Sequence, residues 1–207
     1  MKFLDLGLIP FDEAYALQER LAAEIAAGDT EETVLFLQHP SVYTSGRGGD
    51  PRNLLDPWVR PVQTNRGGDV TWHGPGQLVC YPLLHLGMRG RDLHLYLRFL
   101  EEVLLQALRE FRIEGFRLPG RTGVWTAEGK IASIGVGVRR WVTMHGLAVN
   151  ADPDLSKFSA IHPCGIPRCP VTSMSAVLGK RVGVDEVRER VAQGASRLLP
   201  LLLPQQQ

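Results

Sequence analysis

Apolar side chains follow helical spacing in two long segments of the chain. Within residues 11–28 they recur every three or four positions: Ala14, Leu17, Leu21 and Ile25. This spacing predicts an amphipathic helix that ends at Gly28. Residues 93–111 carry the same period more strongly, and Asp92 directly before them is a residue type that caps helix N-termini. We therefore expect two helices that each bury one face.

Other segments have the pattern of strands. Residues 33–39 (TVLFLQH) form a compact β-rich run, which predicts a buried strand. Residues 69–86 predict a short strand, a tight Gly-Pro-Gly turn and a longer strand. Between residues 123 and 150, three β-rich segments with turns near Glu128-Gly129 and Arg139-Arg140 predict an antiparallel meander.

The segment 159–174 (SAIHPCGIPRCPVTSM) is a loop, because its three prolines lack the N–H group that a helix or central strand needs. A short helix over 174–178 and a last helix from about Asp185 follow it. Strands and helices succeed one another without a βαβ rhythm, which predicts an α+β fold: a mixed, mostly antiparallel sheet covered by helices. No repeat or linker divides the sequence, so we expect a single domain over residues 1–207.

Composition and charge exclude little but favour one compartment. Hydrophobic residues make up 44% and charged residues 22%, and a net charge of +1 gives no reason to expect nucleic acid or membrane as a partner. The N-terminus has acidic residues where a signal peptide needs an apolar run, and three cysteines suit a reducing compartment. We therefore expect a cytoplasmic protein, with a monomer as the simplest state.

Cys164 lies between Pro163 and Gly165 and admits several interpretations. It is an inert buried thiol, as most cysteines are, or a zinc ligand with His162 and Cys169, although no fourth ligand is evident. A disulfide with Cys169 is sterically allowed but unfavourable in a reducing compartment. The remaining interpretation is a nucleophile, which needs a neighbour that stabilises the thiolate.

Lys130 is a candidate for that neighbour. Only four of the 23 basic residues are lysines, and Lys130 begins a predicted strand directly after a tight turn. A solvated hairpin lysine is the plain interpretation. If its side chain instead points at Cys164, its positive charge favours the thiolate.

Two further patterns suggest a binding site. Residues 65–79 (NRGGDVTWHGPGQLV) contain four glycines within ten positions, which is typical of a binding turn or simply of a glycine-rich hairpin. Small residues recur on two strands of the meander: Ser133, Gly135, Gly137, Gly146 and Ala148. They leave a slot for a narrow apolar group, or else allow close packing of the strands.

Taken together, the motifs resemble those of the octanoyl transferase family, also called lipoate-protein ligase B. They are RGGDVTWHGPGQLV, GRTGVW, GKIASIGV, HGLAVN, and IHPCGI followed by VTSM. They occur in the family's order from Arg66 to Met174. One small departure is Trp72, where the family commonly has tyrosine, and the stretch after Cys164 is a local variation whose second cysteine, Cys169, is assigned no role. Each motif alone is weak, but the combination is specific.

The resemblance implies the fold of the biotin and lipoate ligase catalytic domain. It also implies a reaction, the transfer of an octanoyl group from the thioester of acyl carrier protein to a lysine of a lipoyl domain through an acyl-cysteine. This is the first step of endogenous lipoate synthesis. The implied acceptors are the lipoyl domains of 2-oxoacid dehydrogenase complexes and the glycine cleavage H protein. Neither ATP nor a metal is needed.

The resemblance also assigns roles to residues. Cys164 is the acyl-accepting nucleophile and Lys130 is its cationic partner. The acyl site is lined by Arg66, Gly67, Gly68, Asp69, Val70, Thr71, Trp72, His73, Ser133, Ile134, Gly135, His145, Gly146, Leu147 and Ala148. We further expect backbone N–H groups near Gly165, or on the glycine-containing strands, to stabilise the oxyanion.

Two alternatives remain open. An ATP-dependent lipoate or biotin ligase shares the fold and the strand lysine but needs no thiol at position 164. A non-catalytic module that binds acyl carrier protein needs neither residue for chemistry. For acidic protein partners, a basic surface is a further hypothesis, with scattered solvated arginines as its alternative. Its members are Arg89, Arg91, Arg121, Arg139 and Arg140.

Overall fold

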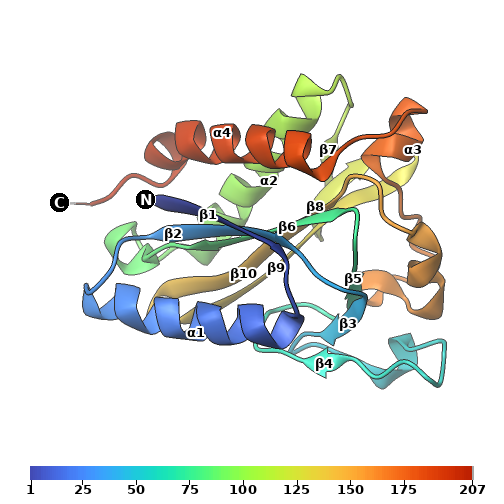
Figure 1. The fold of residues 1–207 in the computed structure, drawn as a ribbon, viewed down its shortest axis with the longest axis horizontal. Coiled ribbons are helices and arrows are strands. Elements are labelled where there is room, and N and C mark those ends of the chain that lie inside the picture. The colour runs from blue at the N-terminus through green and yellow to red at the C-terminus, as the bar shows by residue number, and fades with distance from the viewer. Residues whose placement is uncertain (207) are drawn as a thin grey trace.

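A computed structural model describes residues 1–206 and shows helices on both sides of a central sheet (Figure 1). The strands are β1 (Lys2–Leu8), β2 (Thr33–Gln38), β3 (Val42–Ser45), β4 (Val62–Gln63), β5 (Thr71–His73), β6 (Gln77–Leu83), β7 (Phe116–Leu118), β8 (Arg121–Thr126), β9 (Gly129–Arg139) and β10 (Val142–Asn150). The α-helices are α1 (Phe11–Ala27), α2 (Leu93–Glu110), α3 (Met174–Leu178) and α4 (Val184–Leu202). Short 3-10 helices are η1 (Pro51–Asn53), η2 (Leu86–Met88), η3 (Leu155–Ala160) and η4 (Pro163–Gly165).

The main sheet has seven strands in the order β1-β2-β6-β10-β9-β8-β7. Only β1 and β2 run parallel, and every other neighbouring pair is antiparallel. In the β9–β10 pair, Ser133 lies opposite Ala148 and Val136 opposite His145. The predicted meander of β8, β9 and β10 is therefore confirmed.

Helices cover both faces of this sheet (Figure 1), and each face has its own hydrophobic core. α2 and α4 cover the larger core, and α1 covers the smaller one. Side chains of β10 alternate between them, so Leu147 and Val149 pack under α2 and α4 while Met144 and Ala148 pack under α1. The expected fold class, a mixed and mostly antiparallel sheet covered by helices, is confirmed.

A second sheet of three strands, β4-β3-β5, lies beside the cysteine-containing loop. Its small core joins Val70 and Trp72 to Phe158 and Ile161. Its strands β4, β3 and β5 contain only two, four and three residues, which is too few to show a hydrophobic period. Of these three strands, the sequence therefore predicted only β5.

The ends of the two main helices follow their sequence signals. Gly28 follows α1 with φ 84° and closes the last turn through its N–H. Asp92 precedes α2, and its carboxylate accepts the N–H of Leu95 at 2.8 Å. Within residues 1–206, none of the helices combines the length and apolar character required to cross a membrane.

We expect Asp92→Ala to lower the free energy of unfolding by about 1 kcal/mol, because the substitution leaves an N–H of the first turn of α2 without its acceptor. Urea unfolding of the purified variant measures this loss. Asp92→Asn retains an acceptor oxygen and serves as the control. Equal stability of Asp92→Ala and the parent would show that the cap contributes nothing.

Candidate active site

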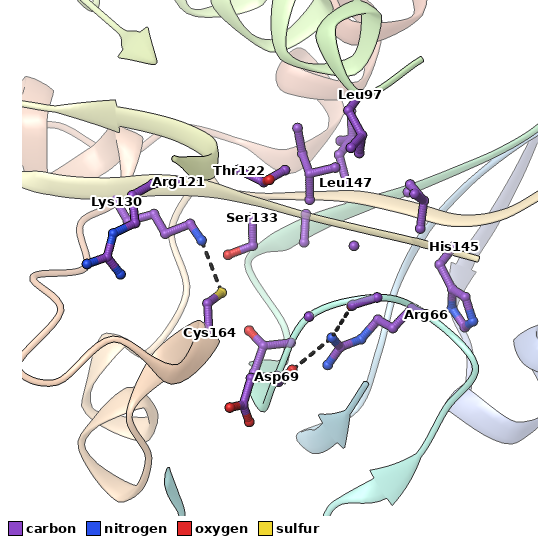
Figure 2. Close-up of a pocket in the computed structure, with 18 of the residues that line it drawn as sticks. Arg66, Asp69, Leu97, Arg121, Thr122, Lys130, Ser133, His145, Leu147 and Cys164 are labelled. Carbon is purple, nitrogen blue, oxygen red and sulfur yellow. Dashed lines mark hydrogen bonds between the residues drawn. The ribbon is translucent and has the colours of Figure 1, made fainter. Parts of the chain in front are cut away.

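A cavity of about 410 Å³ opens between β9, β10 and the loop that carries residues 66–69 (Figure 2). It brings together Cys164, Lys130 and thirteen of the predicted acyl-site residues: Arg66, Gly67, Gly68, Asp69, Thr71, His73, Ser133, Ile134, Gly135, His145, Gly146, Leu147 and Ala148. Its volume is in the range of pockets that hold small ligands. Segments that lie far apart in the sequence therefore meet at one site.

Cys164 is held next to the residue that precedes β5. Its N–H donates to the carbonyl oxygen of Val70 at 2.9 Å. Its φ of 57° lies in the left-handed region, which costs a residue other than glycine on the order of 1–3 kcal/mol and often marks functional sites. In this conformation the half-buried thiol points toward Lys130 (Figure 2).

Lys130 places its ammonium 3.0 Å from the Cys164 sulfur. The residue is only 3% exposed, and Nζ lies 5.6 Å from the centroid of the Trp125 ring. Among the ion pairs of residues 1–206, none joins Lys130 to a carboxylate. A buried cation needs a compensating partner, and the Cys164 sulfur is the atom placed closest to supply one.

The backbone of Lys130 also anchors the end of the cysteine-containing loop. Its N–H donates to the carbonyl oxygen of Pro170 at 2.8 Å, and its carbonyl oxygen accepts the N–H of Thr172 at 3.0 Å. These two hydrogen bonds fix the loop against β9. The loop that supplies the thiol is thus tied directly to the residue that supplies the cation.

Gly123 on β8 leaves room for the lysine side chain. Its φ is 119°, and a Cβ at this position would lie 2.9 Å from Lys130 Cε and 2.6 Å from the carbonyl oxygen of Ala132. The N–H of Gly123 donates to the buried carboxylate of Glu101 on α2 at 3.3 Å. The sequence marks Gly123 only as part of the GRTGVW motif, and no local pattern connects it with Glu101 or Lys130.

The predicted lining fails at two positions because side chains of β5 alternate. Thr71 and His73 face the cavity, whereas Val70 and Trp72 face the small core. Trp72 packs edge-to-face on Phe158, and its indole N–H donates to Ser41 Oγ at 2.9 Å. These two residues support the second sheet and do not line the cavity.

The small residues of the meander divide between the two expected uses. Gly135 and Ser133 line the cavity. At Gly146 a Cβ would lie 2.4 Å from the carbonyl oxygen of Cys80, and at Gly137 it would lie 3.0 Å from Asn65 Oδ1. The missing side chain of Gly146 therefore allows close approach of β6, so only its backbone borders the cavity.

The expected oxyanion donors at Gly165 are not free. The N–H of Gly165 donates to the carbonyl oxygen of His162 at 3.0 Å, and that of Cys164 is bonded to Val70. A backbone N–H that is already donated within the protein cannot also stabilise a substrate oxyanion without losing its partner. The N–H groups of Cys164 and Gly165 therefore do not serve as the donors in this geometry, and the other expectation, donors on the glycine-containing strands, stays a prediction.

Two buried histidines form the polar end of the cavity. His73 Nδ1 contacts Gln77 Oε1 at 2.6 Å, and His145 Nε2 contacts Asn65 Oδ1 at 2.7 Å. Burial lowers the pKa of His73 and that of His145 to about 3. Both rings are therefore neutral near pH 7.

His145 lies on the α1 side of the sheet because its backbone departs from regular strand geometry. Its φ is 56°, and its N–H donates to Gln18 Oε1 on α1 at 2.6 Å. The ring then stacks on Tyr15 at 5.4 Å and faces Phe11 at 6.4 Å. This places an aromatic wall of α1 at the end of the cavity.

The five arginines proposed as a basic surface occupy different environments. Arg89 is buried and pairs with Glu32 at 2.5 Å, so it is a structural ion pair. Arg121 is exposed and lines the cavity, together with Arg47, which the sequence did not single out. Arg91 lies 5.6 Å from the Trp141 ring, and Arg139 pairs with Glu19 at 3.7 Å.

Several other lining residues also escaped prediction. They are Phe11, Tyr81, Leu93, Leu97, Gly120, Thr122, Val136 and Ile166. Leu93 and Leu97 are one helical turn apart on α2, but nothing in the sequence indicates which cavity that face meets. Across the part of the chain that the structure describes, no group of three or more His, Cys, Asp and Glu side chains is placed to hold a metal ion.

The sheet, its helices and the cavity define a protein of the lipoate and biotin ligase fold class. The structure matches a crystal structure of lipoate-protein ligase A bound with ATP with a TM-score of 0.75, at 18% identity, over 96% of this chain and 85% of the other. It matches biotin protein ligase from Aquifex aeolicus with a TM-score of 0.55, at 18% identity, over 96% and 68%. At these identities the likeness shows the fold alone.

Sequence comparison then specifies the family within this class. Residues 10–196 match the lipoyl protein ligase A/B catalytic domain, and the chain belongs to this family. The octanoyltransferase of Geobacter sulfurreducens is 60% identical over 100% of this chain and 88% of its own length. The octanoyltransferase of Gloeobacter violaceus is 46% identical over 94% of this chain and 88% of its own length. The family expected from the motifs is confirmed.

We expect Lys130→Ala to slow iodoacetamide alkylation of Cys164 at pH 7 by at least about tenfold, because the thiolate loses its cation. The rise of the alkylation rate with pH should also move to higher pH. Peptide mapping by mass spectrometry separates Cys164 from Cys169, and Lys180→Ala, a substitution of an exposed lysine, is the control. An unchanged rate in Lys130→Ala would remove its proposed effect on the sulfur.

The buried histidines predict loss of stability in acid. Between pH 6.5 and about 3 the unfolded chain binds a proton at His73 and at His145 that the folded protein does not bind. Lowering the pH from 7.5 to 5 should therefore reduce the free energy of unfolding by about 1–2 kcal/mol for each of them. Urea unfolding at both pH values measures the loss. His73→Gln should show a smaller loss, and equal losses in the two proteins would contradict the prediction.

Proposed function

We propose that this protein is an octanoyltransferase that carries the acyl group on Cys164. The observation that carries the proposal is the 3.0 Å contact between a buried ammonium and a thiol at the wall of a cavity. Relatives named octanoyltransferase that are 46–60% identical over nearly the whole chain support the same function. The donor is the thioester of octanoyl-acyl carrier protein, and the acceptor is a lysine of a lipoyl domain.

In the first half-reaction the Cys164 sulfur attacks the carbonyl carbon of the donor thioester. A C–S bond forms, and the carbonyl electron pair moves to oxygen. When the tetrahedral intermediate collapses, the bond to the carrier's sulfur breaks. That sulfur leaves with the proton of the Lys130 ammonium, so Cys164 holds the acyl group beside a neutral amine.

In the second half-reaction the lysine amine of the lipoyl domain attacks the acyl-cysteine. The neutral Lys130 takes the proton that the attacking amine loses, and Cys164 departs as the thiolate. The ammonium–thiolate pair is then restored. Because an amide is more stable than a thioester, the overall transfer is favourable without ATP, and the acyl shift between sulfur atoms requires no metal.

The acyl chain lies along β9 and β10. Val136 follows Ser133 by three positions, and a strand rises about 3.3 Å per residue, so this stretch measures roughly 10 Å. An extended octanoyl chain has a comparable length. The methyl end of the octanoyl chain would meet His145 and Tyr81. A longer apolar chain would have to displace the polar groups of these two side chains.

Both partners are proteins of the cytoplasm in this proposal. The cysteines of this chain are free, which suits a reducing compartment. The acceptors are the lipoyl domains of 2-oxoacid dehydrogenase complexes and the glycine cleavage H protein. Arg47 and Arg121 at the cavity give the entrance a positive charge that complements acidic partners.

The test is acylation by octanoyl-acyl carrier protein without ATP or divalent cations, followed by intact mass measurement. We expect one octanoyl group per chain in the parent protein and in Cys169→Ala, and none in Cys164→Ala. Addition of a lipoyl domain should then discharge the acyl group onto its lysine. Acylation that requires ATP would favour a ligase, and acylation that survives in Cys164→Ala would reject the cysteine mechanism.

A further inference from the structure

The loop that faces Cys164 has its carbonyl groups bound elsewhere. The carbonyl oxygens of Gly67 and Asp69 accept from the Arg66 guanidinium at 3.2 and 2.8 Å. The carbonyl oxygen of Gly68 accepts the N–H of Gly48 at 3.1 Å, and that of Val70 accepts the N–H of Cys164 at 2.9 Å. Each carbonyl oxygen from residue 67 to residue 70 therefore already accepts a hydrogen bond from within the protein.

Of the four N–H groups in the same loop, two donate to acceptors within the protein and two do not. The N–H of Gly67 donates to Val136 at 2.8 Å, and that of Val70 donates to the Asp69 carboxylate at 2.5 Å. Within residues 1–206, the N–H groups of Gly68 and Asp69 donate to no protein acceptor. Both residues line the cavity together with Cys164. Two successive N–H groups without a protein acceptor therefore belong to residues that line the same cavity as the nucleophile.

The Asp69 side chain does not compete for these donors in the geometry observed. Its carboxylate accepts the Asn53 amide at 2.5 Å, and a Cβ on Gly165 would lie 2.9 Å from Oδ2. Figure 2 shows this carboxylate pointing away from the Cys164 sulfur and Lys130. The negative charge of Asp69 is thus held against Asn53 and Gly165 and is directed away from the reacting sulfur.

We propose that the N–H groups of Gly68 and Asp69 form the oxyanion hole of the acyl-transfer reaction, and that Arg66 is the residue that positions them. This inference rests on the proposed function, because it concerns the tetrahedral intermediates of acyl transfer. In each half-reaction the attacking atom bonds to the carbonyl carbon and an electron pair moves to oxygen. The two N–H groups stabilise that oxygen until the carbonyl reforms and the leaving group departs.

Arg66 is suited to this positioning role by its burial and its bonds. It is 8% exposed, and its second guanidinium nitrogen donates to the carbonyl oxygen and the Oγ1 of Thr44 at 2.8 and 2.9 Å. The guanidinium therefore ties two carbonyls of its own loop to β3. Lysine at this position has one point-like donor group and cannot form the same fork.

Gly68 allows a direct test because its φ is 83°, a conformation that alanine adopts poorly. Gly68→Ala should displace the two N–H groups, lowering the rate of Cys164 acylation by octanoyl-acyl carrier protein by about a hundredfold. Alkylation by iodoacetamide forms no oxyanion, so its rate at Cys164 should stay within about twofold. Arg66→Lys should give the same separation of the two rates to a smaller degree.

Gly28→Ala is the matched control, since Gly28 has φ 84°, nothing within 4 Å of its Cβ position, and a place outside the cavity. It carries the same backbone strain and should change neither rate. The proposal is overturned if Gly68→Ala leaves acylation unchanged or lowers alkylation equally, whatever the outcome for Arg66→Lys.

A long-chain alkyl trifluoromethyl ketone separates this inference from the proposed function. The Cys164 sulfur adds to its carbonyl carbon and the electron pair moves to oxygen, but no group leaves. Fluorine NMR measures the affinity of this adduct even if the protein accepts no acyl group from a carrier. At least tenfold weaker binding to Gly68→Ala than to the parent or Gly28→Ala supports the oxyanion hole, and equal binding rejects it.

Discussion

The site depends on a buried ammonium whose close partner is a sulfur atom. Lys130 is almost inaccessible to solvent, its Nζ lies 3.0 Å from Cys164, and the aromatic ring of Trp125 is on another side. A cation in such a place is unfavourable unless a neighbour carries compensating charge. A thiolate meets this requirement. In the proposed function, the lysine and the cysteine therefore each make the charged form of the other tolerable.

The fold maintains this contact through backbone hydrogen bonds. The peptide of Lys130 is bonded to Pro170 and Thr172, and the N–H of Cys164 is bonded to Val70. The loop between these bonds is short and rich in proline, so its two ends define where the thiol lies. β9, the strand that carries the lysine, lies inside a seven-stranded sheet with cores on both faces. The position of the Cys164 thiol, which lies on a strained loop, is thus fixed relative to β9, a rigid element of the sheet.

Much of this arrangement could be predicted from the sequence, and the exceptions have physical causes. Helical spacing and the turns of the meander are local signals, so α1, α2 and β8–β10 were predicted. β1 was missed although Leu4, Leu6 and Leu8 alternate with polar or small residues, because it is an edge strand whose side chains are mostly exposed and bury no face. The sequence could not show which residues of β5 face the cavity, because all three are buried. Trp72 was therefore assigned to the cavity although it packs in the small core. Gly123 depends on tertiary contacts with Lys130, which no local pattern reports.

The ionisable side chains of the cavity include two buried cations and two neutral histidines. Lys130 and Arg66 are buried cations, and burial lowers the pKa of Arg66, as expected for a guanidinium without a carboxylate partner. His73 and His145 are kept neutral by burial at the other end of the cavity. Arg66 lies against β9, where a Cβ on Gly135 would be 3.6 Å from its Nη1, so cationic groups are found both beside the sulfur and along the strand. In the proposed acyl transfer, negative charge moves from sulfur to the carbonyl oxygen and back, and Lys130 and Arg66 supply positive potential at this part of the cavity.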